Sequence, residues 1–150
     1  AEKLYAKMYN DLPGIKVVIP TESEDINEHW DVMINDIKVD VKAIKKNDEN
    51  IHFVEFKNVL GRKGWLYGEA DKIAFERKND FVIVDRMDLT KFCEKAVAPI
   101  FVKSVNEALY KIYRRKTRKD VISMVLMTDI VDDIENIIYW NKVVDNKNKV

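Results

Sequence analysis

Residues 31–57 read DVMINDIKVDVKAIKKNDENIHFVEFK, which contains three short apolar stretches separated by two polar turns. Branched and aromatic residues alternate with polar residues along these stretches, which is typical of half-buried β-strands. The pair at residues 35–36, Asn-Asp, suits a tight hairpin turn because both residues tolerate the left-handed backbone conformation. The segment therefore predicts three consecutive strands, at 31–34, 39–43 and 51–57.

The turns also predict which acidic residues face each other across these strands. A two-residue loop at 35–36 places Asp31 beside Asp40. A second turn centred on residues 47–48 places Asp40 directly opposite Glu55, with their Cβ atoms roughly 5 Å apart. The sequence therefore predicts a row of carboxylates in the middle of a largely apolar sheet.

Chemistry is expected from this row because it combines acids with a lysine. Side chains alternate along a strand, so Glu55 and Lys57 are expected on the same face. Like charges that face each other destabilise a sheet, and a bound Mg²⁺ or Mn²⁺ is the simplest compensation. Such an ion polarises a phosphodiester and lowers the pKa of an attacking water. The alternative interpretation is an amphipathic hairpin whose acids are exposed to solvent.

Asp40 together with the later run Glu55-Phe56-Lys57 resembles the D…(D/E)xK signature of the PD-(D/E)XK nuclease superfamily. The order of the expected elements over residues 21–95 is also similar to the αβββαβ core of that family. The resemblance implies one α/β domain over residues 1–150, with a restriction-endonuclease-like core and a mixed central sheet. Extra C-terminal helices, including a basic one, are expected within residues 101–140.

The resemblance also implies roles for individual residues. Asp40 and Glu55 are expected to bind Mg²⁺, for which Mn²⁺ substitutes, and Lys57 is expected to be the catalytic lysine. Members of the family often add a glutamate from an upstream helix, and Glu24 and Glu28 are the candidates for that role in this chain.

A second frame of the same motif is present. It takes Asp31 as the first acid and Asp40-Val41-Lys42 as the DxK run. The family's proline before the first acid is absent from the Glu55 frame, where Val39 precedes Asp40. The Glu55 frame is nevertheless preferred, because it uses the longer connection and the apolar central strand.

Two later segments have features of nucleic-acid contacts. Three of the four glycines fall in residues 61–68 (GRKGWLYG), where Arg62 and Lys63 are expected to contact the backbone of DNA. The alternative for this block is a tight connection with Trp65 packed in the core. Residues 110–119 hold six basic side chains in ten positions, which is either a phosphate-binding segment or a solvated face. Its expected phosphate donors are Arg114, Arg115, Arg118 and Lys119.

Hydrophobic spacing and capping signals predict the remaining elements. Helices are expected at 2–11, 21–29, 69–77, 89–96, 105–119 and 128–138. Strands are expected at 81–84 and 122–127. The single cysteine, Cys93, excludes an intramolecular disulfide and a cysteine-rich zinc site, and we expect it in the core.

The charge of the chain is balanced in total but not along its length. The chain holds 26 Lys+Arg and 26 Asp+Glu, and this balance argues against indiscriminate, charge-driven binding of polyanions. Residues 1–60 carry 8 basic and 12 acidic side chains, whereas residues 101–120 carry 7 and 2. No run of 18 apolar residues occurs, and residues 1–12 lack the apolar region of a signal peptide, so a cytoplasmic protein without membrane contact is expected.

These features lead to one hypothesis and two alternatives. The hypothesis is a Mg²⁺-dependent endonuclease that acts on duplex or branched DNA as a homo-oligomer. The resemblance implies phage or mobile-element enzymes such as homing endonucleases and junction resolvases. The alternatives are a catalytically silent nucleic-acid-binding protein with the nuclease fold and an unrelated α/β interaction domain.

Overall fold

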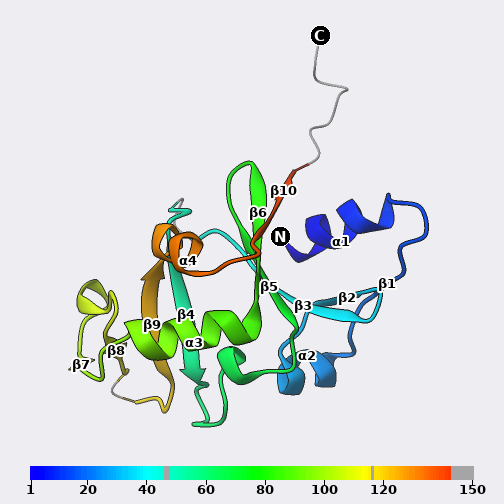
Figure 1. The fold of residues 1–150 in the computed structure, drawn as a ribbon. Coiled ribbons are helices and arrows are strands. Elements are labelled where there is room, and N and C mark those ends of the chain that lie inside the picture. The colour runs from blue at the N-terminus through cyan, green and yellow to red at the C-terminus, as the bar shows by residue number, and fades with distance from the viewer. Residues whose placement is uncertain (46–47, 116, 143–150) are drawn as a thin grey trace.

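The computed structural model describes residues 1–45, 48–115 and 117–142. Within these residues the strands form two sheets (Figure 1). The larger sheet has the order β1 (Val17–Val18), β2 (Val32–Ile34), β3 (Ile37–Lys42), β5 (Lys72–Glu76), β6 (Asp80–Asp85) and β10 (Ile138–Asn141). The smaller sheet has the order β4 (Ile51–Lys57), β9 (Val121–Leu126), β8 (Ile112–Tyr113) and β7 (Phe101–Val102).

Four α-helices and two short 3₁₀ turns complete the described fold. The helices are α1 (Glu2–Asn10), α2 (Glu22–Glu28), α3 (Arg86–Ala96) and α4 (Met127–Asp133). The 3₁₀ turns are η1 (Trp65–Tyr67) and η2 (Val105–Glu107). The expected single α/β domain with a mixed sheet is confirmed, because β3 and β5 are parallel while the other pairs of the larger sheet are antiparallel. No helix in the described part of the chain is long and apolar enough to cross a membrane.

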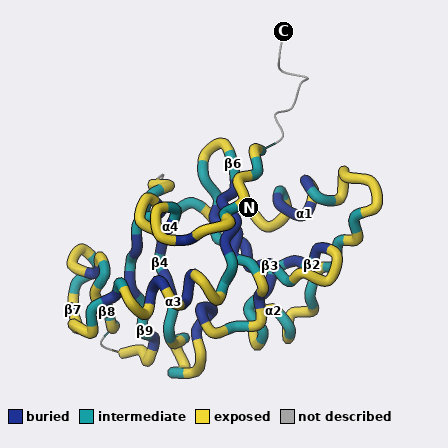
Figure 2. The backbone as a smooth tube through the Cα atoms, in the orientation of Figure 1, coloured by how far each residue is buried: buried dark blue, intermediate teal, exposed yellow. Residues whose placement is uncertain are grey.

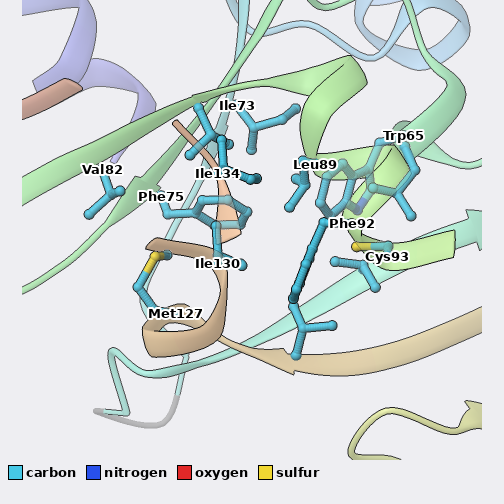
Figure 3. Packing of buried hydrophobic residues seen from close by; sticks show 14 of the residues in the cluster. Trp65, Ile73, Phe75, Val82, Leu89, Phe92, Cys93, Met127, Ile130 and Ile134 are labelled. Carbon is cyan, nitrogen blue, oxygen red and sulfur yellow. The ribbon is translucent and has the colours of Figure 1, made fainter. Parts of the chain in front are cut away.

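The larger sheet is buried on both faces. Alternate residues of β5 point to opposite sides, so Ile73 and Phe75 join one apolar cluster and Ala74 joins another. The first cluster also takes residues from α3, α4 and the smaller sheet, as Figure 3 shows for Leu89, Phe92, Cys93, Met127 and Ile130. In the second cluster α1 contributes Tyr5, whose ring lies 5.1 Å from that of Phe81. Dark buried segments therefore run through the middle of the molecule in Figure 2.

Local signals predicted several elements correctly. Asn35 and Asp36 have φ angles of 47° and 69°, and they close the hairpin in which Val32 pairs with Val39. Thr21 and Glu24 form a reciprocal capping box at the start of α2, which lies within the helix expected at 21–29. The expected helices at 2–11 and 89–96 correspond to α1 and α3, and the expected strands at 81–84 and 122–127 correspond to β6 and β9. Cys93 is fully buried, as expected.

Three predicted helices are wrong in whole or in part. Residues 69–77 contain the strand β5, whose short apolar run fills a position buried on both faces of the sheet. Residues 105–119 contain η2 and β8 instead of a basic helix. The helix expected at 128–138 ends at Asp133, where Ile134 takes an extended conformation, and Asn136, with a φ of 59°, precedes β10. Only α4 follows α3 among the described helices, so the expectation of several C-terminal helices is also wrong.

Candidate active site

The predicted pairing of Asp40 with Glu55 is wrong. Asp40 on β3 lies beside Ile73 of β5, whereas Glu55 on β4 lies beside Ile122 of β9. The two acids therefore belong to different sheets (Figure 1). Strand β5 takes the place next to β3 because all three of its central side chains are fully buried, which suits the interior of a two-sided sheet. The centre of the predicted second turn, residue 47, lies outside the described residues.

The predicted neighbourhood of Asp31 and Asp40 is confirmed, and we call these two residues the carboxylate pair. The β2–β3 hairpin carries them, and the Asp31 N–H donates to the Val39 carbonyl at 2.8 Å. The Val41 N–H donates to Asp31 Oδ2 at 2.7 Å, which fixes the orientation of that carboxylate. Asp40 is 4% exposed, so its carboxylate is held in a largely dry environment.

Lys42 completes this group from the same strand. Its Nζ lies 3.0 Å from Asp40 Oδ2, so the two form an ion pair, and this buried oxygen accepts no hydrogen bond from the other described residues. The Lys42 Nζ also lies 4.3 Å from the centre of the Trp65 ring, a cation–π contact that holds the amine in place. Trp65 itself is buried in the apolar core, as Figure 3 shows. Asp31, Asp40 and Lys42 therefore form one compact group.

The carboxylate pair is electrostatically strained. Burial, followed by the nearby charge of Asp40, raises the pKa of Asp31 to about 7. Burial also raises the pKa of Asp40, although Lys42 and a hydrogen bond with Asp31 act in the opposite direction. Two acids so close together cannot both ionise without cost, so the pair retains a proton near neutral pH.

Two acids that the sequence prediction missed lie at the rim of the pair. Asp25 of α2 is exposed, and its charge contributes to the raised pKa of both Asp31 and Asp40. Glu2 of α1 is also mostly exposed, and partial desolvation and the carboxylates of Asp31 and Asp25 raise its pKa. No local signal marks Glu2, because only the docking of α1 onto the sheet brings it near residues far along the chain.

The two glutamates expected to join the site have other partners. Glu24 accepts a hydrogen bond from the Thr21 N–H at 3.1 Å as part of the capping box. Glu28 Oε1 lies 3.1 Å from Lys38 Nζ, and it accepts a hydrogen bond from Trp30 Nε1 at 3.2 Å. These contacts hold α2 and its connection to the sheet in place, and they give neither glutamate a role beside the carboxylate pair.

Glu55 and Lys57 line different clefts, so the prediction that they share a face is wrong. The pairing of β4 with β9 shifts between these residues, which marks a β-bulge. A bulge inserts an extra residue and interrupts the alternation of side chains. Glu55 consequently lines a cleft of about 490 Å³ together with Lys42, whereas Lys57 lines a separate cleft of about 710 Å³.

The larger cleft, which we call the basic cleft, collects three cations. Lys57 contributes from β4, while Arg114 and Lys119 contribute from the two ends of the segment between β8 and β9. All three are exposed, and none forms a salt bridge with a described residue. Apolar side chains, among them Phe56 and Phe101, form much of the remaining wall.

The other residues expected to contact nucleic acid do not all lie at the basic cleft. Arg62 and Lys63 are exposed, and Lys63 forms an antiparallel bridge with Lys57. Arg118 is also exposed. Arg115 instead forms an ion pair with the buried Asp120 and lines the smaller cleft. The basic segment is therefore divided between two surfaces.

The carboxylate pair is suited to a divalent cation, although it supplies only two protein ligands. No three His, Cys, Asp or Glu side chains within residues 1–45, 48–115 and 117–142 are arranged to hold a metal ion. Mg²⁺ often uses one or two carboxylates, with waters and substrate phosphates as its other ligands. The buried oxygen of Asp40 that lacks a hydrogen bond and the mutual repulsion of the pair both fit such an ion.

We expect the thermal stability of the metal-free protein to fall as the pH rises from about 4 to about 7. The folded state keeps a proton on Asp31 that the unfolded chain loses near its ordinary pKa of 3.8, so this contribution to stability is lost as the pH approaches the folded pKa of about 7. At about 1.4 kcal/mol per pKa unit, and allowing for partial exposure, the loss is on the order of 2 kcal/mol. That corresponds to a melting temperature lower by roughly 4–8 °C.

Differential scanning fluorimetry in EDTA at pH 5 and pH 8 measures this effect. Asp31→Asn should remove most of the difference, because an amide does not titrate but still accepts the Val41 hydrogen bond. Asp36→Asn is the matched control, since Asp36 is exposed in the turn and asparagine tolerates its positive φ. An Asp31→Asn variant with the pH dependence of the wild type would contradict the shared-proton account.

Comparison with known proteins adds no assignment. No family model, no curated protein and no solved structure matches the chain. The functional inference therefore rests on the carboxylate pair, Lys42 and the basic cleft.

Proposed function

We propose that this protein is a metal-dependent DNA endonuclease whose site consists of Asp31, Asp40 and Lys42. The carboxylate pair beside Lys42 carries this proposal, because a buried acidic oxygen without a hydrogen bond lies next to an amine that is held in place. This is the second frame of the nuclease-like motif, with Asp40-Val41-Lys42 as the DxK run. Glu55 and Lys57 are not assigned the ligand and catalytic roles that the preferred frame gave them, because a β-bulge separates their directions.

Each residue of the group has a defined task in this proposal. A bound Mg²⁺ would polarise a phosphoryl oxygen of the substrate and lower the pKa of a bound water. Asp31 and Asp40 hold that ion, and the Val41 N–H keeps the Asp31 carboxylate aimed. Lys42 lies between Asp40 and the Trp65 ring, so its amine is positioned to interact with the phosphate in the transition state.

The basic cleft is the proposed contact for the phosphate backbone. Lys57→Gln, Arg114→Gln and Lys119→Gln in one variant should lower the affinity for DNA about tenfold or more and reduce its salt dependence. The slope of log affinity against log salt should fall by about 3, because about one counterion is released per phosphate contact. Fluorescence anisotropy with a labelled duplex in EDTA measures this slope.

The matched control for the basic cleft is Lys7→Gln, which removes a positive charge from an exposed position on α1. It should leave the slope within experimental error of the wild type. A triple variant that keeps the wild-type slope would show that DNA is held elsewhere.

The direct test of the proposed activity uses the wild-type protein. We expect nicking or linearisation of supercoiled plasmid with Mg²⁺ or Mn²⁺ and none with EDTA. Linear duplexes and four-way junctions in the same assay identify the preferred DNA structure, and sedimentation with and without DNA measures whether the protein acts as the expected homo-oligomer. Folded protein that binds DNA but cleaves none of these substrates with either metal would contradict the endonuclease and favour a catalytically silent binding protein.

A further inference from the structure

The smaller cleft, which we call the Asp120 cleft, begins at Lys42 and extends between the two sheets. It has a volume of about 490 Å³, which falls within the usual range for small-molecule sites. Its charged lining side chains are Lys42, Lys45, Glu55, Arg115 and Asp120. Four of them form one charged end, since Arg115 pairs with Asp120 and the charges of Lys42 and Asp120 act on Glu55. The walls are largely apolar and aromatic, and they include Phe53, Trp65, Val105, Tyr113 and Ile122.

Asp120 is the most unusual residue of this cleft. It is 2% exposed, and Arg115 donates to its Oδ2 through both Nε and Nη2. The other carboxylate oxygen, Oδ1, is buried and has no hydrogen-bond partner among the described residues. A buried acceptor of this kind is costly unless a donor reaches it, so Asp120, which lines this cleft, has an unmet requirement for an N–H or O–H group.

Glu55 provides a second acceptor at the same end. It is partly buried, and burial, with a smaller contribution from the charge of Asp120, raises its pKa, although His29 and Lys42 act in the opposite direction. Arg115 also offers a donor, because its Nη1 makes no hydrogen bond to a described residue. The charged end therefore offers adjacent acceptors with a donor beside them.

This arrangement fits a neutral, flat ligand better than a metal ion. Lys42, Lys45 and Arg115 supply three positive charges against the two acids of this cleft, so these acids need no further cation. The missing partner of Asp120 Oδ1 is a hydrogen-bond donor. Guanine presents two adjacent donors, N1–H and the N2 amino group, next to the acceptor O6, whereas the other three bases of DNA lack two adjacent ring-edge donors.

We propose that the Asp120 cleft binds an unstacked guanine base. Asp120 Oδ1 and Glu55 accept from the N1 and N2 donors, Arg115 donates to O6, and the aromatic and branched walls cover the ring. This proposal rests on the proposed function, because the guanine is taken to be a base of the DNA substrate. Since Lys42 belongs both to the carboxylate pair's group and to this cleft, the bound guanine lies next to the phosphate that is cleaved.

Binding of free deoxynucleosides tests this inference without metal and without a phosphate group. In saturation-transfer NMR with EDTA, deoxyguanosine should bind the wild type about tenfold or more tightly than deoxyadenosine, deoxycytidine or thymidine. Asp120→Asn should lose most of this preference. The asparagine oxygen can still accept from Arg115, but its amino group puts a donor where Asp120 offers its second acceptor. Glu55→Gln is a second variant that should weaken deoxyguanosine binding if Asp120→Asn fails to fold.

The matched control is Asp132→Asn, an exposed position on α4 that should leave binding unchanged. Equal binding of the four deoxynucleosides, or no binding, to folded wild type would overturn the guanine site. So would Mn²⁺-induced broadening of the Val105 and Ile122 methyl signals that disappears in Asp120→Asn, since that result would identify a cation site.

The proposed guanine site and the proposed endonuclease activity can be contradicted independently of each other. Selective binding of deoxyguanosine by a protein that cleaves no DNA would support the guanine site and contradict the endonuclease. Metal-dependent cleavage with no preference for guanine beside the cut, and no selective binding, would overturn the guanine site alone.

Discussion

Asp40→Asn is expected to abolish metal-dependent DNA cleavage, with a rate loss of about 10³-fold under single-turnover conditions. The reason is that the buried Asp40 carboxylate both supplies a ligand for the ion and holds Lys42 at 3.0 Å. A loss of about 4 kcal/mol of transition-state stabilisation, the size expected for a metal's charge, corresponds to this factor. Stability should not fall, because the amide removes one of two mutually repelling charges.

The combination of lost activity and retained stability separates a catalytic role from a structural one. Cleavage of supercoiled plasmid gives the rate, and thermal melting at pH 8 gives the stability. Glu22→Gln is the matched control, since Glu22 is an exposed acid on α2. This variant should cleave DNA at the wild-type rate. Wild-type cleavage by Asp40→Asn would contradict the site, and a collapse in its melting temperature would indicate that Asp40 serves the fold.

The second large effect concerns the glycine block. Gly64→Ala is expected to destabilise the protein by about 3 kcal/mol or more, which lowers its melting temperature by roughly 6–12 °C. A Cβ at Gly64 would lie 2.2 Å from the carbonyl oxygen and 2.6 Å from the carbonyl carbon of Glu55, and these backbone atoms of β4 cannot move aside as a flexible side chain could. The Gly64 N–H also donates to the Phe56 carbonyl at 2.9 Å, so the loop is tied to β4 at this point.

Gly14→Ala provides the comparison for this prediction. Gly14 has a φ of +76°, and nothing lies within 4 Å of a Cβ built there. Its replacement should therefore cost only the backbone strain of a left-handed residue, about 1 kcal/mol. Thermal melts of the two variants measure the difference, and equal losses would show that close approach to β4 is not what requires glycine at position 64.

Features set by neighbouring residues were predictable from the sequence. The turn at Asn35 and Asp36 has its own conformational chemistry, so the register that brings Asp31 to Asp40 followed from local rules. The capping box of Thr21 and Glu24 is another such case. The turn therefore placed the two acids of the candidate site beside each other, and Lys42 lies on the same hairpin.

The acids around this pair and the choice between the two frames depend on contacts between distant segments. Residues 72–76 are too short an apolar run to distinguish a helix from a buried strand, so the parallel pairing of β3 with β5 was not predictable. The bulge between Glu55 and Lys57 is set by the pairing of β4 with β9, nearly 70 residues later in the chain. The choice between the two frames of the motif therefore required the three-dimensional arrangement.

The most direct test of the central claim compares two lysines. Single-turnover cleavage at saturating DNA and Mg²⁺ should fall about 10²-fold or more in Lys42→Ala, because Lys42 lies beside Asp40. Lys57→Ala should cleave within about tenfold of the wild type, since Lys57 lines the basic cleft and saturating DNA compensates for weaker binding. A severe loss in Lys57→Ala together with near-normal cleavage by Lys42→Ala would contradict the assignment of Asp31, Asp40 and Lys42 as the active site.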